Sequence, residues 1–315
     1  MEWSGSVERI RTDDGVELAV YDFGGPDGAG GQPRSSSPGA VDPGAMDLDA
    51  PALLLAHATG FHARCWLPVV AVLREHFHCY AFDERGHGDS STPPDGDFDW
   101  HRFADDALGV VDHFGLRRPF AVGHSCGGAL LLLAEAARPG TFRALYTFEP
   151  VVMPFDEPPP AGSLPDNPLA AGARKRRSEF PSYEAALENF SSKPPMAGFR
   201  PDALEAYVRF GFEPLDQAAA RAGGPVRLKC SGEDEARTYE AAAFNGVYPR
   251  LGEVRCPVTL ACGELTTAFD EAAMLRNEAR LPLARVEVLP GLTHFGPLEG
   301  PDLLVARVLH AFLSA

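Results

Sequence analysis

A serine flanked by glycines is the first group in this chain that could act as a nucleophile. The pentapeptide GHSCG at 123–127 follows the apolar run 119–122 and precedes a helical pattern over 129–137. A tight turn from strand to helix strains the backbone of its central residue, and neighbouring glycines let the strand and helix approach closely. The pattern therefore predicts that Ser125 stands at a helix N-terminus, where the helix dipole stabilises developing negative charge.

A histidine near the end of the chain could be the base for this serine. His294 lies in PGLTHFGP, 290–297, after the last strand-like run and before the last helical pattern. A neutral imidazole at that place can take the serine proton and later give it to the leaving group. His57, His87 and His124 lie in turn motifs instead, and we expect them to brace those turns.

Four motifs in chain order resemble those of the α/β-hydrolase family. HATGF at 57–61 is similar to the family's HGxxG oxyanion loop, and DERGHGDS at 83–90 to its D-x-R-G-x-G-x-S turn. GHSCG is similar to its nucleophile elbow, and His294 stands in the place of its late histidine. The resemblance covers nearly the whole chain outside 24–50, and it implies an α/β-hydrolase fold that uses serine chemistry.

The resemblance also implies an oxyanion hole, in which main-chain N–H groups stabilise the oxygen that becomes negative during attack. The two donors would be the N–H groups of Cys126 and Thr59. Ala58 stands where the family usually has glycine. This departure leaves Gly60 open as an alternative to Thr59.

The position that usually carries the acid, the carboxylate that orients the histidine, departs from the family pattern in this chain. Members usually carry an aspartate two residues beyond the Gly-Glu that ends the strand before the last, and Thr266 occupies that position here. Some α/β-hydrolases, including certain dehalogenases and the fungal zearalenone lactonase, take the acid from the strand after the nucleophile helix. That strand, 144–148, ends in Glu149 at the sheet edge where open α/β sheets build their sites. We therefore predict Glu149 as the acid, with Asp270 and Glu264 as alternatives.

Apolar runs of four to six residues alternate with helical patterns and should form the scaffold for these groups. Continuous apolar runs are typical of strands that helices cover on both faces, so they predict an α/β fold with a mostly parallel, doubly wound sheet. Two earlier β-like runs, 7–11 and 16–21, flank an Asp-Gly turn and predict an antiparallel pair. The apolar runs cover 52–56, 79–82, 119–122, 144–148, 257–262 and 285–289.

The alternation is interrupted between 151 and 252, where proline-rich turns surround helical patterns. We interpret 151–252 as a mainly helical cap, and 1–150 with 253–315 as the hydrolase core. Residues 24–50 are rich in Gly, Pro, Ser and Asp and predict a flexible surface insertion. The cap weakly resembles that of a hydrolase branch containing a yeast peroxisomal lipase and fungal toxin-biosynthesis hydrolases. Its aromatic residues predict an apolar, moderately closed pocket.

The overall composition narrows the class of partner. The 315 residues carry 28 Lys and Arg against 44 Asp and Glu, a formal charge of −16 that disfavours nucleic acid and anionic membranes. The six cysteines have no metal-ligand spacing and are expected to be buried thiols. The chain shows neither a secretory signal nor an apolar run long enough to span a bilayer, so we expect a cytoplasmic monomer or homodimer without a membrane span.

These residues predict a serine hydrolase that cleaves a carboxylic ester or lactone of a small to medium apolar substrate. The chemistry proceeds through an acyl-enzyme and needs no metal or organic cofactor. Two alternatives stay open. One is a hydrolase of the same fold that cleaves carbon–carbon bonds or thioesters, and the other is a non-catalytic protein that binds a small ligand.

Overall fold

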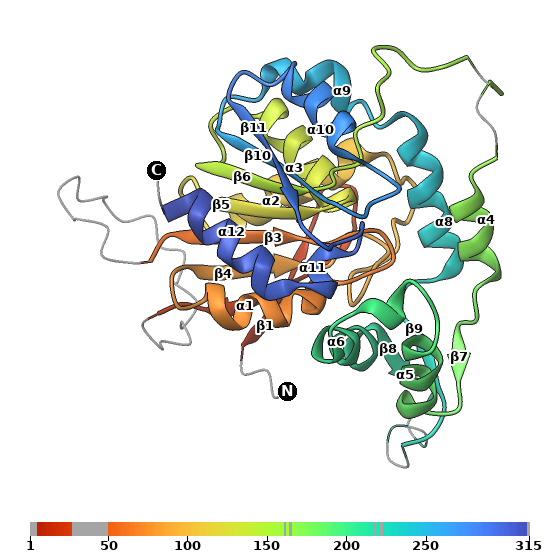
Figure 1. The fold of residues 1–315 in the computed structure, drawn as a ribbon. Coiled ribbons are helices and arrows are strands. Elements are labelled where there is room, and N and C mark those ends of the chain that lie inside the picture. The colour runs from red at the N-terminus through yellow and green to blue at the C-terminus, as the bar shows by residue number, and fades with distance from the viewer. Residues whose placement is uncertain are drawn as a thin grey trace.

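An eight-stranded sheet forms the centre of the molecule (Figure 1). The structure, a computed structural model, describes residues 5–26, 50–160, 162–163, 166–216, 218, 220 and 223–313. The strand order is β1-β2-β4-β3-β5-β6-β10-β11; β2 pairs antiparallel with β1 and β4, and the other pairs are parallel. This order confirms the predicted mostly parallel sheet. The strands are β1 (Ser6–Arg11), β2 (Glu17–Gly24), β3 (Ala52–Ala56), β4 (His78–Phe82), β5 (Phe120–His124), β6 (Ala144–Phe148), β10 (Val258–Gly263) and β11 (Ala284–Leu289).

Helices pack on both faces of this sheet, which explains the continuous apolar runs. Successive residues of β3 point to opposite faces. Leu54 packs in the core shared with α2, α3 and α10, whereas Leu53 and Leu55 pack in the core shared with α1 and α12. All three leucines are fully buried. The helices of the core are α1 (Leu67–Leu73), α2 (Trp100–His113), α3 (Cys126–Ala137), α10 (Glu271–Glu278), α11 (Gly296–Glu299) and α12 (Pro301–Leu313), with a 3₁₀ turn, η1 (Ala63–Trp66).

The chain leaves the sheet after β6 and returns to it at β10, and we call residues 149–257 the inserted segment. Figure 1 shows its α4, α5, α6 and α8 with a small sheet to one side of the main sheet, whereas α9 lies beside α10 of the core. A small sheet in it, of order β7-β9-β8, was not predicted, because its strands have only two or three residues and show no period. Its elements are α4 (Pro168–Lys175), β7 (Glu179–Phe180), α5 (Tyr183–Ser191), η2 (Met196–Gly198), α6 (Pro201–Gly211), β8 (Phe212–Pro214), β9 (Val226–Leu228), α8 (Gly232–Ala241), η3 (Ala242–Phe244), α9 (Val247–Arg250) and η4 (Leu251–Glu253).

The inserted segment packs on the main domain through aromatic side chains. Phe61, from the loop after β3, contacts the rings of Phe199 and Tyr207 from the inserted segment. An ion pair between Lys229 and Asp89 also joins the two parts. The inserted segment therefore lies against the loop that follows β3.

Three further expectations concern the cysteines, a membrane span and residues 24–50. All six cysteines are buried and free, as predicted. In the part of the chain that the structure describes, no helix is both long and apolar enough to cross a membrane. Most of residues 24–50, the predicted surface insertion, lies outside the described residues.

Candidate active site

Ser125 occupies a strained turn between β5 and α3. Its backbone has φ 55° and ψ −113°, a left-handed conformation that side chains rarely adopt, and its N–H donates to the carbonyl of Phe148 at 2.9 Å. Gly127 makes this turn possible, because a Cβ atom there would collide with the carbonyl oxygens of Ala56 and His57. The turn places Ser125, which is 7% exposed, at the N-terminus of α3.

The three residues predicted to form a triad lie in one hydrogen-bonded line. His294 Nε2 is 3.2 Å from Ser125 Oγ, and His294 Nδ1 is 2.7 Å from Glu149 Oε2. Because a carboxylate only accepts, Nδ1 carries the proton, and Nε2 is then free to accept the serine proton. Glu149 is completely buried, whereas the His294 side chain keeps 21% of its surface exposed.

The carboxylate of Glu149 accepts hydrogen bonds from the neighbouring strand β10 and from the loop after that strand. The N–H of Gly263 donates to Oε1 at 3.0 Å, and the Thr266 hydroxyl donates to Oε2 at 2.8 Å. The hydroxyl's own orientation is set by the N–H of Ala268, which donates to it at 3.2 Å. Thr266, at the family's usual acid position, thus supports the carboxylate that faces His294. The sequence showed that Thr266 replaces the usual acid, but it did not show that the Thr266 hydroxyl donates to Glu149.

The alternative acids Glu264 and Asp270 have other partners. Glu264 Oε2 accepts from the N–H of Gly291 at 2.9 Å, and Asp270 Oδ1 accepts from the N–H of Ala273 at the start of α10. These contacts brace the loop before His294 and the N-terminus of α10. Among the described residues, the carboxylate that reaches His294 is that of Glu149.

The two residues predicted to supply the oxyanion donors, Cys126 and Thr59, interact through their side chains. Burial and the charge of Glu84 raise the pKa of the Cys126 thiol well above its usual value, while a side-chain hydrogen bond with Thr59 acts in the opposite direction. The thiol is therefore protonated at neutral pH and does not compete with Ser125 as a nucleophile. Within the described residues, the main-chain N–H groups of Thr59 and Cys126 donate to no protein acceptor. The N–H of Gly60, the alternative to Thr59, also has no protein acceptor among these residues, so both stay candidates for the second donor.

The three other motif histidines hold turns together. His57 accepts from the N–H of Glu84 at 2.9 Å, His87 contacts the carbonyl of Arg85, and His124 Nε2–H donates to the carbonyl of His294 at 2.8 Å. Burial lowers the pKa of His124 to about 3 and that of His87 to about 4, and it places the pKa of His57 well below the usual value. All three are neutral at physiological pH.

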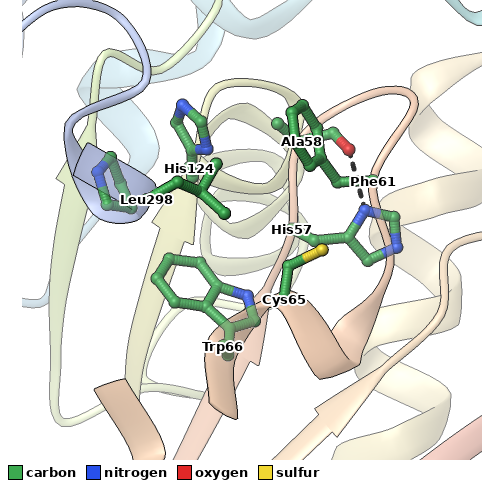
Figure 2. Close-up of a pocket in the computed structure, with 8 residues that line it drawn as sticks. His57, Ala58, Phe61, Cys65, Trp66, His124 and Leu298 are labelled. Atoms are coloured by element: carbon green, nitrogen blue, oxygen red, sulfur yellow. Dashed lines mark hydrogen bonds between the residues drawn. The ribbon is translucent and has the colours of Figure 1, made fainter. Parts of the chain in front are cut away.

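A narrow pocket adjoins this arrangement (Figure 2). Its volume is about 10 Å³, close to the lower limit for one water-sized group. The loop 57–61, η1 and α11 supply its walls, and no sequence pattern indicated that η1 contributes to it. The lining residues are His57, Ala58, Phe61, Cys65, Trp66, His124, Pro297 and Leu298.

Comparisons with known proteins agree with this architecture. The model of the alpha/beta hydrolase family matches residues 53–307. The 2-(acetamidomethylene)succinate hydrolase of Mesorhizobium japonicum is 24% identical over 265 residues, which cover 84% of this chain and 88% of that protein. RutD of Agrobacterium fabrum, provisionally assigned as a carbamate hydrolase, is 33% identical over 276 residues, covering 86% of this chain and 97% of that protein.

A solved structure extends the likeness to the whole fold. The peroxisomal α/β-hydrolase Lpx1 of Saccharomyces cerevisiae superposes with a TM-score of 0.74 at 17% identity, over 99% of this chain and 88% of that one. At this identity the likeness shows the fold alone. The parallel sheet, the serine turn and the family match together define an α/β hydrolase. The chain belongs to the α/β-hydrolase family, and it is a hydrolase.

Proposed function

We propose that this hydrolase cleaves a carboxylic ester or lactone of a small to medium apolar molecule through an acyl-enzyme. Ser125 is the nucleophile, His294 the base and Glu149 the acid. The observation that carries the proposal is the hydrogen-bonded line from Ser125 Oγ through His294 to the buried Glu149 carboxylate, with distances of 3.2 and 2.7 Å. In this arrangement the nucleophile has a neighbouring base, and the Glu149 carboxylate keeps the proton of that base on Nδ1.

The reaction follows from the positions of these groups. His294 Nε2 takes the proton of Ser125 as Oγ bonds to the substrate carbonyl carbon. The carbonyl oxygen becomes negative and accepts hydrogen bonds from the N–H groups of Cys126 and Thr59. The bond to the leaving alcohol then breaks, and that oxygen takes the proton from His294. Water, deprotonated by His294, adds to the acyl group and releases the acid and free Ser125.

We also propose that residues 151–252 act as a cap over this site. Two contacts support this role, the packing of Phe199 and Tyr207 on Phe61 in the loop next to Thr59. An aromatic cover of this kind favours dissolved apolar molecules over emulsified triglyceride. Rates that rise sharply once substrate exceeds its solubility would instead identify a mobile lipase lid.

The relatives favour a second candidate substrate class. Two of them are named for a 2-(acetamidomethylene)succinate and for a carbamate, and both compounds hold an acyl group bonded to nitrogen. The same serine chemistry can cleave such a bond if His294 protonates the leaving nitrogen. Amides and carbamates therefore belong in the same substrate panel as esters and lactones.

A fluorophosphonate probe and a substrate panel test the proposal. We expect the probe to label Ser125 in the wild-type protein and to leave Ser125→Ala unlabelled, with peptide mapping to locate the adduct. The panel compares p-nitrophenyl esters of different chain length with lactones, thioesters, anilides and carbamates. Folded protein that neither reacts with the probe nor turns over any acyl compound would support the ligand-binding alternative.

A further inference from the structure

The pocket of Figure 2 adjoins the proposed reaction centre. Two of its wall residues directly precede proposed catalytic groups: His124 precedes Ser125, and Ala58 precedes Thr59. The wall therefore borders both the proposed nucleophile and the proposed oxyanion donors, and His124 also donates to the carbonyl of His294 at 2.8 Å. His294 Nε2, which the leaving group must reach, faces Ser125 Oγ and does not line the pocket, so the acyl portion is the part that we take to enter it.

Trp66 lines this pocket and carries a hydrogen-bond donor without a partner among the described residues. The residue is only 3% exposed, and its Nε1–H is buried without an acceptor among the described residues. Figure 2 shows its ring across the bottom of the pocket, below His124. A buried donor without a partner costs about 1–3 kcal/mol, so an oxygen placed beside it is strongly favoured.

The polarity and charge of the remaining lining residues indicate which kind of acceptor oxygen the pocket can bind. Ala58, Phe61 and Leu298 are apolar and buried. Among the described residues that line the pocket there is no lysine or arginine, and burial keeps both wall histidines neutral by lowering their pKa. A carboxylate here would be desolvated without a counter-charge, which costs far more than burying a neutral ether or carbonyl oxygen.

We propose that this pocket is the acyl subsite and that it selects short acyl groups carrying a neutral hydrogen-bond acceptor, which accepts from Trp66 Nε1–H. The inference rests on the proposed esterase function and narrows its substrate class. Because the pocket holds about one water-sized group, it takes only the end of a short acyl chain. The indole donor distinguishes an acyl group with an oxygen from its hydrocarbon equivalent.

Two matched esters test this selection. The acyl groups of p-nitrophenyl methoxyacetate and p-nitrophenyl butyrate have the same number of heavy atoms and differ by an ether oxygen in place of a methylene. The measured quantity is the kcat/KM ratio of methoxyacetate to butyrate in the wild type, divided by the same ratio in Trp66→Phe. Intrinsic reactivity cancels in this quotient. We expect a quotient of about 5, the kinetic equivalent of one neutral hydrogen bond.

Trp100→Phe is the matched control, because Trp100 Nε1 donates to the carbonyl of Thr238 at 3.2 Å, away from the pocket. This variant should leave the wild-type ratio unchanged. Leu298→Phe provides a second approach if Trp66→Phe does not fold, since it narrows the pocket from the opposite wall. It should lower the kcat/KM ratio of butyrate to acetate at least tenfold.

The outcomes separate this inference from the proposed function. A quotient near 1 in Trp66→Phe would mean that the indole N–H binds a structural water only, and the subsite assignment would be wrong. An unchanged length preference in Leu298→Phe would overturn it equally. A preference for p-nitrophenyl hydrogen succinate over the butyrate ester that is lost in Trp66→Phe would show that the pocket binds a charged acceptor. That result would overturn the assignment of a neutral one. Absence of all ester turnover and of Ser125 labelling would contradict the proposed function itself.

Discussion

Replacing Glu149 with glutamine gives the sharpest test of the proposed triad. The substitution keeps the size of the side chain and turns one oxygen into an NH₂ group. The hydrogen bond from Gly263 determines which of the two oxygen positions the NH₂ group takes. The main-chain N–H of this glycine donates to Oε1 at 3.0 Å and cannot reverse, so the amide oxygen takes that position and the NH₂ group takes the place of Oε2.

The NH₂ group then faces His294 Nδ1, where Glu149 Oε2 accepts at 2.7 Å in the wild type. Two donors cannot share this hydrogen bond, so the imidazole places its proton on Nε2 and accepts at Nδ1. Nε2–H can no longer take the proton of Ser125. Loss of the correct tautomer in an analogous triad lowers turnover about 10⁴-fold, equivalent to about 5.5 kcal/mol of transition-state stabilisation. We expect a loss of that size in kcat, with a small change in KM.

The assay is steady-state hydrolysis of the best substrate in the ester panel, with circular dichroism and thermal unfolding as checks of the fold. Glu264→Gln and Asp270→Asn are the matched controls, since their carboxylates accept from Gly291 and Ala273 and not from His294. Both controls should retain turnover within about tenfold of the wild type. Near-normal Glu149→Gln beside a crippled Asp270→Asn would refute the assignment and place the acid on the later strand.

Four further predictions concern the support of the site and of the fold. Ser125→Gly should be inactive yet about 1 kcal/mol more stable than Ser125→Ala in thermal unfolding, because glycine relieves the strain at φ 55°. Thr266→Val should lower kcat about tenfold while Thr266→Ser retains most of it, since serine keeps the hydroxyl that donates to the proposed acid at 2.8 Å and valine removes it. Gly127→Ala should lose about 3 kcal/mol or more in urea unfolding, because its Cβ would meet main-chain atoms, whereas Gly109→Ala in α2, with free space around it, should gain about 0.5–1 kcal/mol. Burial lowers the pKa of His62 from 6.5 to about 3, so between these values the imidazole binds a proton in the unfolded chain but not in the folded chain. The free energy of unfolding therefore falls as the pH drops below about 6.5. His62 should contribute about 2 kcal/mol to the difference in unfolding free energy between pH 7 and pH 5, and a His62→Gln variant should show a difference smaller by that amount.

Much of the fold follows from local pattern. Strands that helices cover on both faces must be apolar along their whole length, and this pattern locates β3, β5, β6 and β10 within one or two residues at each end. The predicted runs at β4 and β11 coincide equally well, although the edge strand β11 is only partly buried and carries Arg285 and Glu287. The β7-β9-β8 sheet could not be found this way. Strands of two or three residues are fixed by their partners in space and leave no periodic signal.

The amino-acid sequence alone determined the position of Ser125, because a strained turn between strand and helix depends on glycines a few residues away. It also placed His294 after the last strand. The sequence also favoured Glu149 over Glu264 and Asp270, because Glu149 ends the strand that follows the nucleophile helix. Its contact with His294 became visible only in the tertiary structure. β6 and β10 pair in parallel, and this pairing brings Gly263 and Thr266 onto the Glu149 carboxylate and turns it toward His294. The unmatched Trp66 donor was equally invisible in the sequence, because an indole is recognised as unpartnered only when every surrounding side chain has a position.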